Sequence, residues 1–481
     1  MKLSNTDQKI QVLEPGWTPE RVIRNVINSG VQENAFYVFD IGEVYRRYKE
    51  FITLMPRVQP FYAVKCNDHQ TILKLLADLG AGFDCASKGE INKILGLGVE
   101  ASNIIFANPA KPASHLRHAA STGVNLMTFD NEMELTKIKA LHPSAKLVLR
   151  IRCDAEVVQC NLGMKFGCDA LNEAPRLIRA ARFLGLDLVG ISFHVGSGCG
   201  DPPVFRRAIF AASQLFDYAA TVGYNFQLLD IGGGFPGNKG QSLDEIAAVV
   251  NLALDDFFGD TDVQVIAEPG RYFVASAFTL ATCIHSKREV RNMDEKDSSV
   301  THVMYYINEG VYGAFNVVIY DHFNPIAIPL KGFGGKLTPS SIWGPTCDSM
   351  DMVLENVMLP TLDVGEWFMF ENMGAYTLVA CTTFNGFPTS KVHIVISEED
   401  WLLMTSELSV CEDQFVFGNS PSNLRIGLDV GDEDDKWETP LSVQSPVCRK
   451  PSLSCHVDVL DHCSAQPPSF LCDFVEVEPI N

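Results

Sequence analysis

Basic residues are scarce in this sequence: 38 Lys and Arg stand against 59 Asp and Glu, so the formal net charge is -21. Nucleic acids and anionic membranes attract proteins through clustered Lys and Arg, which argues against both as principal partners. The chain also lacks any apolar run of the ~18 residues that cross a bilayer, and its start, MKLSNTDQKI, lacks the apolar stretch of a secretory signal. We therefore expect a cytoplasmic protein.

Metal-binding motifs are also missing, since neither a pair of C-x-x-C units nor an H-E-x-x-H helix occurs. The 14 cysteines are scattered along the chain, and no secretory signal accompanies them. We expect reduced thiols and no metal site.

Between about Ala35 and Tyr272, short apolar, β-rich segments alternate with amphipathic helical patterns. The predicted strands are Pro60–Val64, Gly82–Asp84, Asn103–Phe106, Leu126–Phe129, Lys146–Ile151, Leu188–His194, Gln227–Asp230 and Gln264–Ala267. The clearest predicted helices are Gln70–Leu79, Glu132–Leu141, Pro203–Val222 and Leu243–Phe258, each with apolar residues three and four apart. About eight strands alternating with helices predict a (β/α)8, TIM-like barrel over residues 35–272.

The pattern changes after Arg271, where helices become rare. Strands are expected at Phe273–Ile284, His302–Ile307, Asn316–Tyr320, Trp367–Phe370 and Val392–Ser397, with a polar loop at Arg288–Thr301. We expect a second, mainly β domain over residues 273–405, joined by residues 1–34.

The last segment, residues 406–481, has no hydrophobic periodicity and carries an acidic run at Asp432–Asp435 followed by Pro440, Pro446, Pro451, Pro467 and Pro468. This composition predicts a disordered, acidic C-terminal tail. It is either a solvated end without a role or a regulatory tail that offers a protease an initiation site.

In a β/α barrel the active site lies at the carboxyl ends of the strands. The polar residues at the predicted ends are Lys65, Asp84, Asn108, Arg150, His194, Asp230, Glu268 and Arg271. One such residue would mean little, because a lone Lys or His is more often a surface or satisfied core group. A set with a lysine, a histidine, two arginines and several carboxylates at one rim predicts a functional site.

Two glycine signals lie at the same rim. The segment DIGGGFPG comes at the end of a predicted strand. Its Gly232, Gly233 and Gly234 have no side chains, so their backbone N–H groups can approach phosphate oxygens. Gly270 and Arg271 add a second backbone approach and a guanidinium. A strand-end lysine near a phosphate site suggests a Schiff base with pyridoxal phosphate, and the alternative is a phosphate-binding lysine.

The motifs resemble those of the eukaryotic ornithine decarboxylases, an alanine-racemase-like, fold type III family, over nearly the whole chain to about Glu398. The shared segments are PFYAVKCN, GFDCASKGEI, LVLRI with MKFG, GISFHVGSGC, LLDIGGGFPG, IAEPGRY, YGAFN with YDH, SSIWGPTCD, and ENMGAYT with FNGF. Gly89 and Glu309 replace the Thr and Asp that are usual in the family. The resemblance implies a barrel that binds pyridoxal phosphate, followed by a β domain.

The resemblance also implies a role for each matching residue. Lys65 would form the Schiff base, and Cys347 would protonate the substrate carbon after carbon dioxide leaves. Lys65, Cys347 and His194 are therefore the expected catalytic residues. The expected cofactor-binding residues are Lys65, Asp84, Arg150, His194, Ser197, Gly232, Gly233, Gly234, Glu268, Gly270, Arg271 and Tyr376, and the expected substrate-binding residues are Asp321, Asp348, Tyr312 and Tyr320.

The implied activity is decarboxylation of L-ornithine to putrescine and carbon dioxide, the first step of polyamine biosynthesis. In the family the site is shared across a homodimer, so Cys347 and Asp348 would come from the partner subunit. Two alternatives stay open: a non-catalytic relative that binds antizyme and acts as an inhibitor, and a lysine or arginine decarboxylase of the same fold. Antizyme is also a possible partner of an active enzyme.

The segment Lys111–Glu134 resembles the family's antizyme-binding element. It carries Lys111, His115, Arg117 and His118, which would form a basic face on an otherwise acidic protein. The alternative is an ordinary solvated helix face.

Overall fold

The computed structural model describes residues 9–259, 261–292 and 299–418, which all belong to one unit of the chain, Met1–Asp429. A closed barrel of eight parallel strands lies within it, in the order β11-β12-β3-β4-β5-β6-β7-β9. The strands are β3 (Val58–Ala63), β4 (Gly82–Cys85), β5 (Ile104–Phe106), β6 (Leu126–Phe129), β7 (Lys146–Arg152), β9 (Asp187–His194), β11 (Leu228–Asp230) and β12 (Gln264–Ala267). The predicted barrel is confirmed, and each of the eight strands predicted for it is present.

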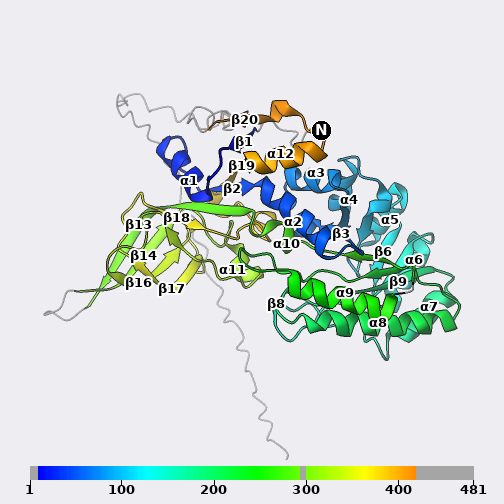
Figure 1. Ribbon diagram of the computed structural model, residues 1–481. Helices are drawn as coiled ribbons and strands as arrows, with labels where there is room; N and C mark the ends of the chain where they lie inside the picture. Colours follow the sequence, from blue (N-terminus) through cyan, green and yellow to red (C-terminus); the bar gives the residue numbers. More distant parts are fainter. Residues whose placement is uncertain (1–8, 260, 293–298, 419–481) are drawn as a thin grey trace, which may run out of the picture. The chain divides into compact units, whose positions relative to one another are not determined.

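Helices surround the barrel, because parallel strands that are apolar on both faces need a second layer to bury them (Figure 1). They are α3 (Gln70–Asp78), α4 (Lys88–Leu95), α5 (Ala113–Thr122), α6 (Glu132–Leu141), α7 (Ala174–Phe183), α8 (Pro203–Thr221) and α9 (Asp244–Phe258). Local signals set several starts: the side chains of Ser87 and Asn131 accept the backbone N–H groups of Glu90 and Glu134 as N-caps.

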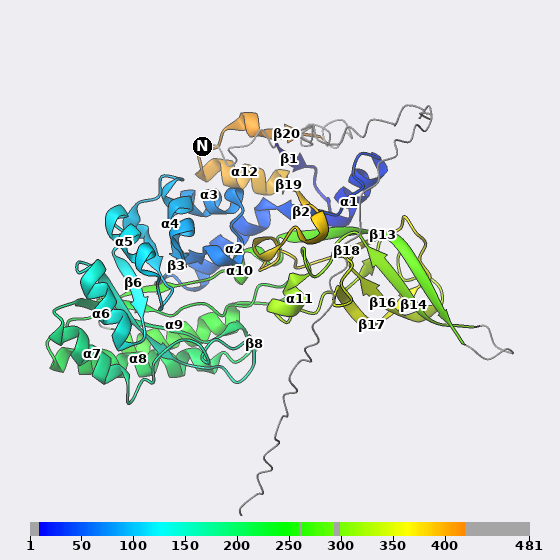
Figure 2. The same ribbon diagram turned by 180° about the vertical axis from the view of Figure 1, so that it is seen from behind.

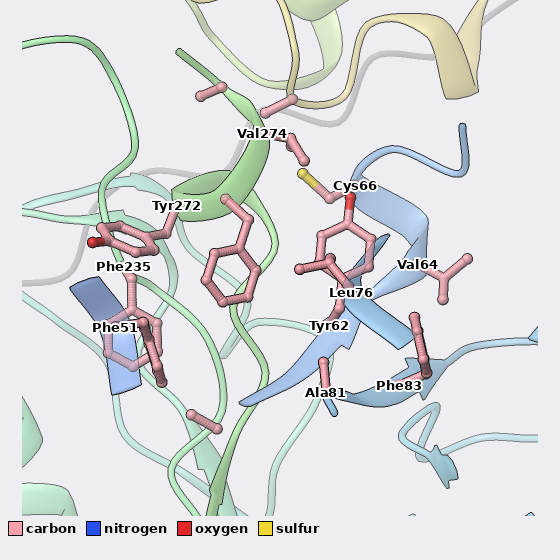
Figure 3. Close-up of a cluster of buried hydrophobic side chains, with 14 of the residues drawn as sticks. Phe51, Tyr62, Val64, Cys66, Leu76, Ala81, Phe83, Phe235, Tyr272 and Val274 are labelled. Atoms are coloured by element: carbon pink, nitrogen blue, oxygen red, sulfur yellow. The ribbon is translucent and has the colours of Figure 1, made fainter. Parts of the chain in front are cut away.

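An aromatic core lies where helix α2 (Ile41–Leu54) and the short α10 (Arg271–Val274) pack together (Figure 3). The ring of Phe51 lies 5.4 Å from that of Phe235 and 5.9 Å from that of Tyr272. Val64 and Cys66, at the end of β3, are fully buried. The backbone on both sides of Lys65 is therefore held by packing.

A second, ten-stranded sheet has the order β17-β16-β14-β13-β2-β19-β1-β20, with β15 and β18 off this path. Its strands are β1 (Ile10–Leu13), β2 (Phe36–Asp40), β13 (Phe278–Arg291), β14 (Val300–Ile307), β15 (Ile328–Pro329), β16 (Leu337–Trp343), β17 (Met352–Pro360), β18 (Trp367–Phe370), β19 (Lys391–Ser397) and β20 (Phe415–Phe417). The mainly β second part is confirmed.

Three predicted segments differ from the structure. Asn316–Tyr320 forms helix α11 instead of a strand. A turn precedes it, in which the N–H of Asn316 donates to Gly313 O, and the chain continues from this turn into the helix. Arg271–Val274 is helical, so β13 begins at Phe278. The predicted loop Arg288–Thr301 is wrong at both ends, since β13 continues to Arg291 and β14 begins at Val300.

The two ends of the described chain meet in the second sheet. β1 pairs in parallel with both β19 and β20, and Figure 2 shows the three strands together with helix α12 (Glu398–Glu407). Residues 406–418 are therefore ordered, contrary to the predicted start of the tail, because Phe415 and Val416 pair with Ile10 and Gln11. Residues 419–481 lie outside the described residues.

The N-terminal part also crosses the predicted domain limit at residue 35. β2 pairs with β13 and β19 of the second sheet, not with the barrel. Helix α1 (Pro19–Asn28) precedes it and contacts β2. No helix in the described ranges is both long and apolar enough to span a membrane.

Candidate active site

Lys65 lies in a short 3-10 turn, Val64–Cys66, directly after β3. Its ammonium forms a hydrogen bond and an ion pair with the carboxylate of Asp84, which is fully buried on the neighbouring strand β4. Burial lowers the pKa of Lys65. The carboxylates of Asp84 and Glu268 raise this pKa by more than burial lowers it, so the net shift is upward. The amine is therefore held charged at the rim beside a fixed counter-ion.

Two more carboxyl groups, Asp230 and Glu268, are buried at the same rim. Burial raises the pKa of each, and the closeness of Asp230 raises that of Glu268 further. Asp230 Oδ1 accepts the N–H of Gly232 at 2.9 Å, whereas Glu268 Oε1 has no hydrogen-bond partner among the described residues. A buried carboxyl oxygen without a partner is costly, which indicates that it is kept for a ligand.

His194 ends strand β9, and its Nδ1 accepts the N–H of Gly196 at 3.1 Å. Burial lowers the pKa of His194, and the positive charges of Arg150 and Lys65 lower it further, so the ring is neutral. Arg150, on β7, lies with its guanidinium 5.4 Å from the ring centre of Phe166. Both residues lie on strands of the same barrel, as predicted.

The glycine turn after β11 has no room for side chains. Gly232 and Gly234 have φ values of +62° and +116°, and a Cβ on Gly233 would lie 2.8 Å from His194 Nε2. A Cβ on Gly270 would lie 2.8 Å from that of Cys66. Glycine is needed at these positions, and the bare backbone leaves the space beside His194 open to a ligand.

Arg271 connects the remaining polar groups of the rim. Its Nη2 donates to Ser197 Oγ at 2.8 Å, and its guanidinium lies 5.1 Å from the ring centre of Tyr376. Its Nε, also buried, has no partner among the described residues. Tyr376 has a left-handed φ of +58°, and its N–H donates to Cys66 O.

Asp321 is paired with Arg271. Arg271 Nη1 donates to Asp321 Oδ2 at 2.8 Å and Nη2 donates to Oδ1 at 2.7 Å, and both side chains are buried. Burial lowers the pKa of Arg271, but Asp321 raises it more. An expected phosphate ligand and an expected substrate ligand therefore form one ion pair, in which the charge of Asp321 is already compensated.

A cavity of about 570 Å³ opens at Lys65. Its lining includes Lys65, His194, Ser197, Tyr320, Asp321 and Tyr376 from the predicted set. It also includes Glu90, Cys160 and Asn316, to which the sequence analysis gave no role. Glu90 and Asn316 lie within the motifs GFDCASKGEI and YGAFN, so their presence in motifs shared with the family could have pointed to them.

The predicted residues Tyr312, Cys347 and Asp348 lie in a separate group, which together with Phe384 and Asn385 we call the open cluster. The Tyr312 hydroxyl donates to Asp348 Oδ2, the rings of Tyr312 and Phe384 stack at 4.4 Å, and Cys347 N–H donates to Asn385 Oδ1 at 3.0 Å. Cys347 and Phe384 are exposed, and no member of the open cluster lines the cavity at Lys65. Phe384 and Asn385 were missed, although the motif FNGF contains both.

The prediction of a basic face on the segment Lys111–Glu134 is wrong for Lys111, which is buried. Its side chain is buried, donates to the carbonyl oxygen of Asn108 at 3.0 Å and pairs with Glu134 at 3.2 Å. Burial lowers its pKa to about 8. Only Arg117 of the four basic residues is exposed, while His115 and His118 are half-buried on α5.

Fold and rim together define a class of β/α-barrel proteins that hold a phosphorylated ligand beside a strand-end lysine. A family profile described as "Pyridoxal-dependent decarboxylase, pyridoxal binding domain" matches residues 41–275. Ornithine decarboxylase of Mus musculus is 48% identical over 406 residues, 82% of this chain and 88% of the mouse protein.

Two further similarities place the chain within this class. Antizyme inhibitor 2 of Xenopus laevis is 46% identical over 406 residues, 82% of this chain and 89% of that protein. The arginine decarboxylase of Paramecium bursaria Chlorella virus, solved with agmatine, has 38% identity and a TM-score of 0.74, and covers 78% of this chain and 100% of that one. The chain belongs to the ornithine decarboxylase family of pyridoxal-dependent decarboxylases.

The residues of the rim fit the family's cofactor, pyridoxal phosphate. An aldehyde needs an amine, which Lys65 could supply, and a phosphate needs hydrogen-bond donors, which the backbone N–H groups of the glycine turn, the Ser197 hydroxyl and the Arg271 guanidinium could supply. A pyridine nitrogen needs an acid, and the unpartnered oxygen of Glu268 is available for it.

Proposed function

We propose that the protein decarboxylates L-ornithine to putrescine and carbon dioxide, the first step of polyamine biosynthesis, with pyridoxal phosphate at the barrel rim. The observation that carries this proposal is Lys65 on one cavity with His194 and Ser197, with its ammonium paired to the buried carboxylate of Asp84. The similarity to ornithine decarboxylases over 82% of the chain supports it.

In this proposal each rim residue has a defined task. Lys65 attaches to the aldehyde, His194 lies against the ring, and Glu268 keeps the pyridine nitrogen protonated. Ser197, Arg271 and the N–H groups of Gly232–Gly234 bind the phosphate. When bound, the cofactor supplies an electron sink for the electron pair that remains when carbon dioxide leaves.

Proton delivery falls to Cys347 of the open cluster. Its thiol would donate the proton that replaces the lost carboxylate on Cα, and Asn385 fixes its backbone N–H. In one chain Cys347 is exposed and lies outside the cavity lining. We therefore propose that the protein works as a homodimer, in which each open cluster completes the cavity of the other subunit.

The charge of Asp348 makes this site selective for diamino acids. Among the described residues no cation pairs with Asp348, whereas Asp321 is compensated by Arg271. Hydrogen bonds from the Met350 N–H and the Tyr312 hydroxyl lower the pKa of Asp348, so it stays ionised. An ionised carboxylate covered by a partner needs a cation, and the distal ammonium of ornithine supplies one.

A second candidate function is the non-catalytic one of an antizyme-binding inhibitor, because Antizyme inhibitor 2 of Xenopus laevis is also 46% identical. The exposed Arg117 on α5 is the observation that favours antizyme binding. Reversing its charge with Arg117→Glu is expected to weaken binding of antizyme, and unchanged binding would rule out this surface. The complete rim set favours catalysis.

The proposed activity is tested by carbon dioxide release from carboxyl-labelled ornithine, lysine and arginine at matched concentration, with added pyridoxal phosphate. Ornithine is expected to give the highest kcat/KM. A higher kcat/KM for lysine or arginine would replace the proposed substrate, and no release from any of the three would leave the inhibitor function.

A further inference from the structure

Gln159 lies on a short two-stranded ribbon that does not belong to the barrel or to the second sheet. Strand β8 (Val158–Cys160) pairs antiparallel with β10 (Ser197–Cys199), and Cys160 lies opposite Ser197. The ribbon therefore carries Ser197, which accepts from Arg271, on one strand and Gln159 on the other.

The amide of Gln159 holds Asp321 by two hydrogen bonds. Its Nε2 donates to the backbone oxygen of Asp321 at 2.7 Å and to the carboxylate Oδ2 at 2.9 Å. The neighbouring Cys160 Sγ donates to Oδ1 at 3.5 Å. Because one donor group binds both the backbone and the side chain, the carboxylate cannot rotate without losing a bond.

Together these contacts saturate the carboxylate of Asp321. Each oxygen accepts one Nη of Arg271, Oδ2 also accepts Gln159, and Oδ1 also accepts Cys160. A carboxylate offers about four acceptor directions, so all of them are in use. Asp321 is thus fixed from two sides, by Arg271 and by the ribbon.

The side chain of Gln159 is itself confined. Gly198, opposite it on β10, has a φ of +65°, and a Cβ there would lie 3.0 Å from both Cβ and Oε1 of Gln159. The ribbon backbone therefore lies against the glutamine, which has little freedom to release Asp321.

We propose that Gln159 is a positioning residue that fixes Asp321 and thereby sets the length of the diamino acid that the cavity accepts. Lys65 and Asp321 line the same cavity, so the saturated Asp321 is a fixed wall that limits the path of a substrate from Lys65 to the carboxylate of Asp348, which receives its distal ammonium. One methylene in a pocket changes relative rates by only about 10- to 200-fold, so a small movement of Asp321 affects the selection. This inference rests on the proposed function.

The test compares kcat/KM for ornithine and lysine in the wild type and in two variants of the full-length holoenzyme. Gln159→Leu keeps the size of the side chain but removes the donor, and Gln159→Glu places a second carboxylate beside Asp321. We expect the preference for ornithine to fall about tenfold in Gln159→Leu, mainly through KM, and further in Gln159→Glu.

The matched control is Asn161→Ala on the same segment. Asn161 is exposed, and its side chain accepts the N–H of Gly163 without touching Asp321. The control is expected to keep the ornithine-to-lysine ratio and the melting temperature of the wild type, and both Gln159 variants should keep that melting temperature. A drop in kcat alone, with an unchanged ratio, would show a merely structural role and overturn the proposal.

A binding measurement separates this inference from the proposed function. The dissociation constants of putrescine and cadaverine, measured by calorimetry, report on chain length without turnover. If Gln159→Leu narrows their ratio about tenfold, the positioning role holds even where ornithine is not decarboxylated. If the ratio stays within about twofold of the wild type, Gln159 does not set the length, whatever the wild-type activity is.

Discussion

The barrel rim and the open cluster differ in how their charged groups are paired. At the rim, Lys65 pairs with Asp84 and Arg271 pairs with Asp321, and these carboxylates are buried. In the open cluster, Cys347 is exposed and Asp348 meets only a hydroxyl and a backbone N–H among the described residues. These two ion pairs of the rim form within one chain, whereas the charge of Asp348 in the open cluster has no cationic partner among the described residues.

The two regions therefore differ in the step that fixes their charged groups, which is folding for the rim and contact with another surface for the open cluster. Folding of the barrel fixes the rim charges before any ligand arrives, which is the arrangement that lowers reorganisation during a reaction. The side chains of the open cluster gain a low-dielectric environment only when another surface covers them. Substitutions in the two regions should therefore differ in size and in dependence on the partner.

The largest effect is expected for Lys65→Ala, which removes the only rim group able to attach to an aldehyde. Activity towards labelled ornithine should fall at least about 1,000-fold. Lys74→Ala is the control, because Lys74 pairs with Asp78 on helix α3 and does not line the cavity at Lys65. Retention of more than a tenth of the wild-type rate by Lys65→Ala would contradict the assignment of the rim.

Mixing two inactive variants tests most directly whether the rim and the open cluster of one site come from different subunits. If the open cluster completes the cavity of its partner, random mixing of Lys65→Ala with Cys347→Ala makes half of the dimers mixed, each with one intact site. About a quarter of the wild-type activity should return. Absence of any recovery, with mixed dimers shown by native mass spectrometry, would place both residues in the same subunit's site.

Asp348→Asn tests whether the open cluster is covered in the working protein. Loss of a covered, unpaired carboxylate should lower kcat/KM for ornithine at least about 30-fold, mainly through KM. An exposed carboxylate would matter only a few-fold. Asp363→Asn, at an exposed carboxylate that pairs with Lys287, serves as the control. An effect below about fivefold would mean that no partner covers Asp348.

The smallest effect is expected for Tyr312→Phe, which removes one hydrogen bond to Asp348 and should raise KM about fivefold. After the bond of the Met350 N–H, this bond is the second cause that lowers the pKa of Asp348. Only the ionised carboxylate binds an ammonium, so the rise of KM on the acid side should begin at a higher pH in the variant. A KM profile that does not move along the pH axis would remove Asp348 from substrate binding.

The barrel could be predicted from sequence because each of its strands is a short apolar run with a polar residue at its end. Segments of mixed character were missed. Strands β8 and β10 are three residues long and only partly buried, so periodicity does not detect them. The run NVVIY favours a strand by composition, but it forms α11 after the turn at Gly313–Phe315, an override by tertiary context.

The residues of the site were predicted better than their pairing. Motif similarity placed Arg271 and Asp321 on the list with separate roles, but their ion pair joins positions 50 residues apart. The bonds from Gln159 to Asp321 span 162 residues. No local pattern specifies such contacts, because they depend on how the segment after α11 lies against Arg271 and the β8–β10 ribbon.

The position of β1 has a consequence for synthesis on the ribosome. Gln11 pairs with Val395, and Val12 pairs with both Ile396 and Phe417. At a synthesis rate of about 5–20 residues per second, the first strand of the chain waits roughly 20–80 s for its neighbours to emerge. All eight barrel strands precede β19 in the chain, so they can pair with one another while β1 still has an open edge, and that edge closes only when β19 and β20 emerge.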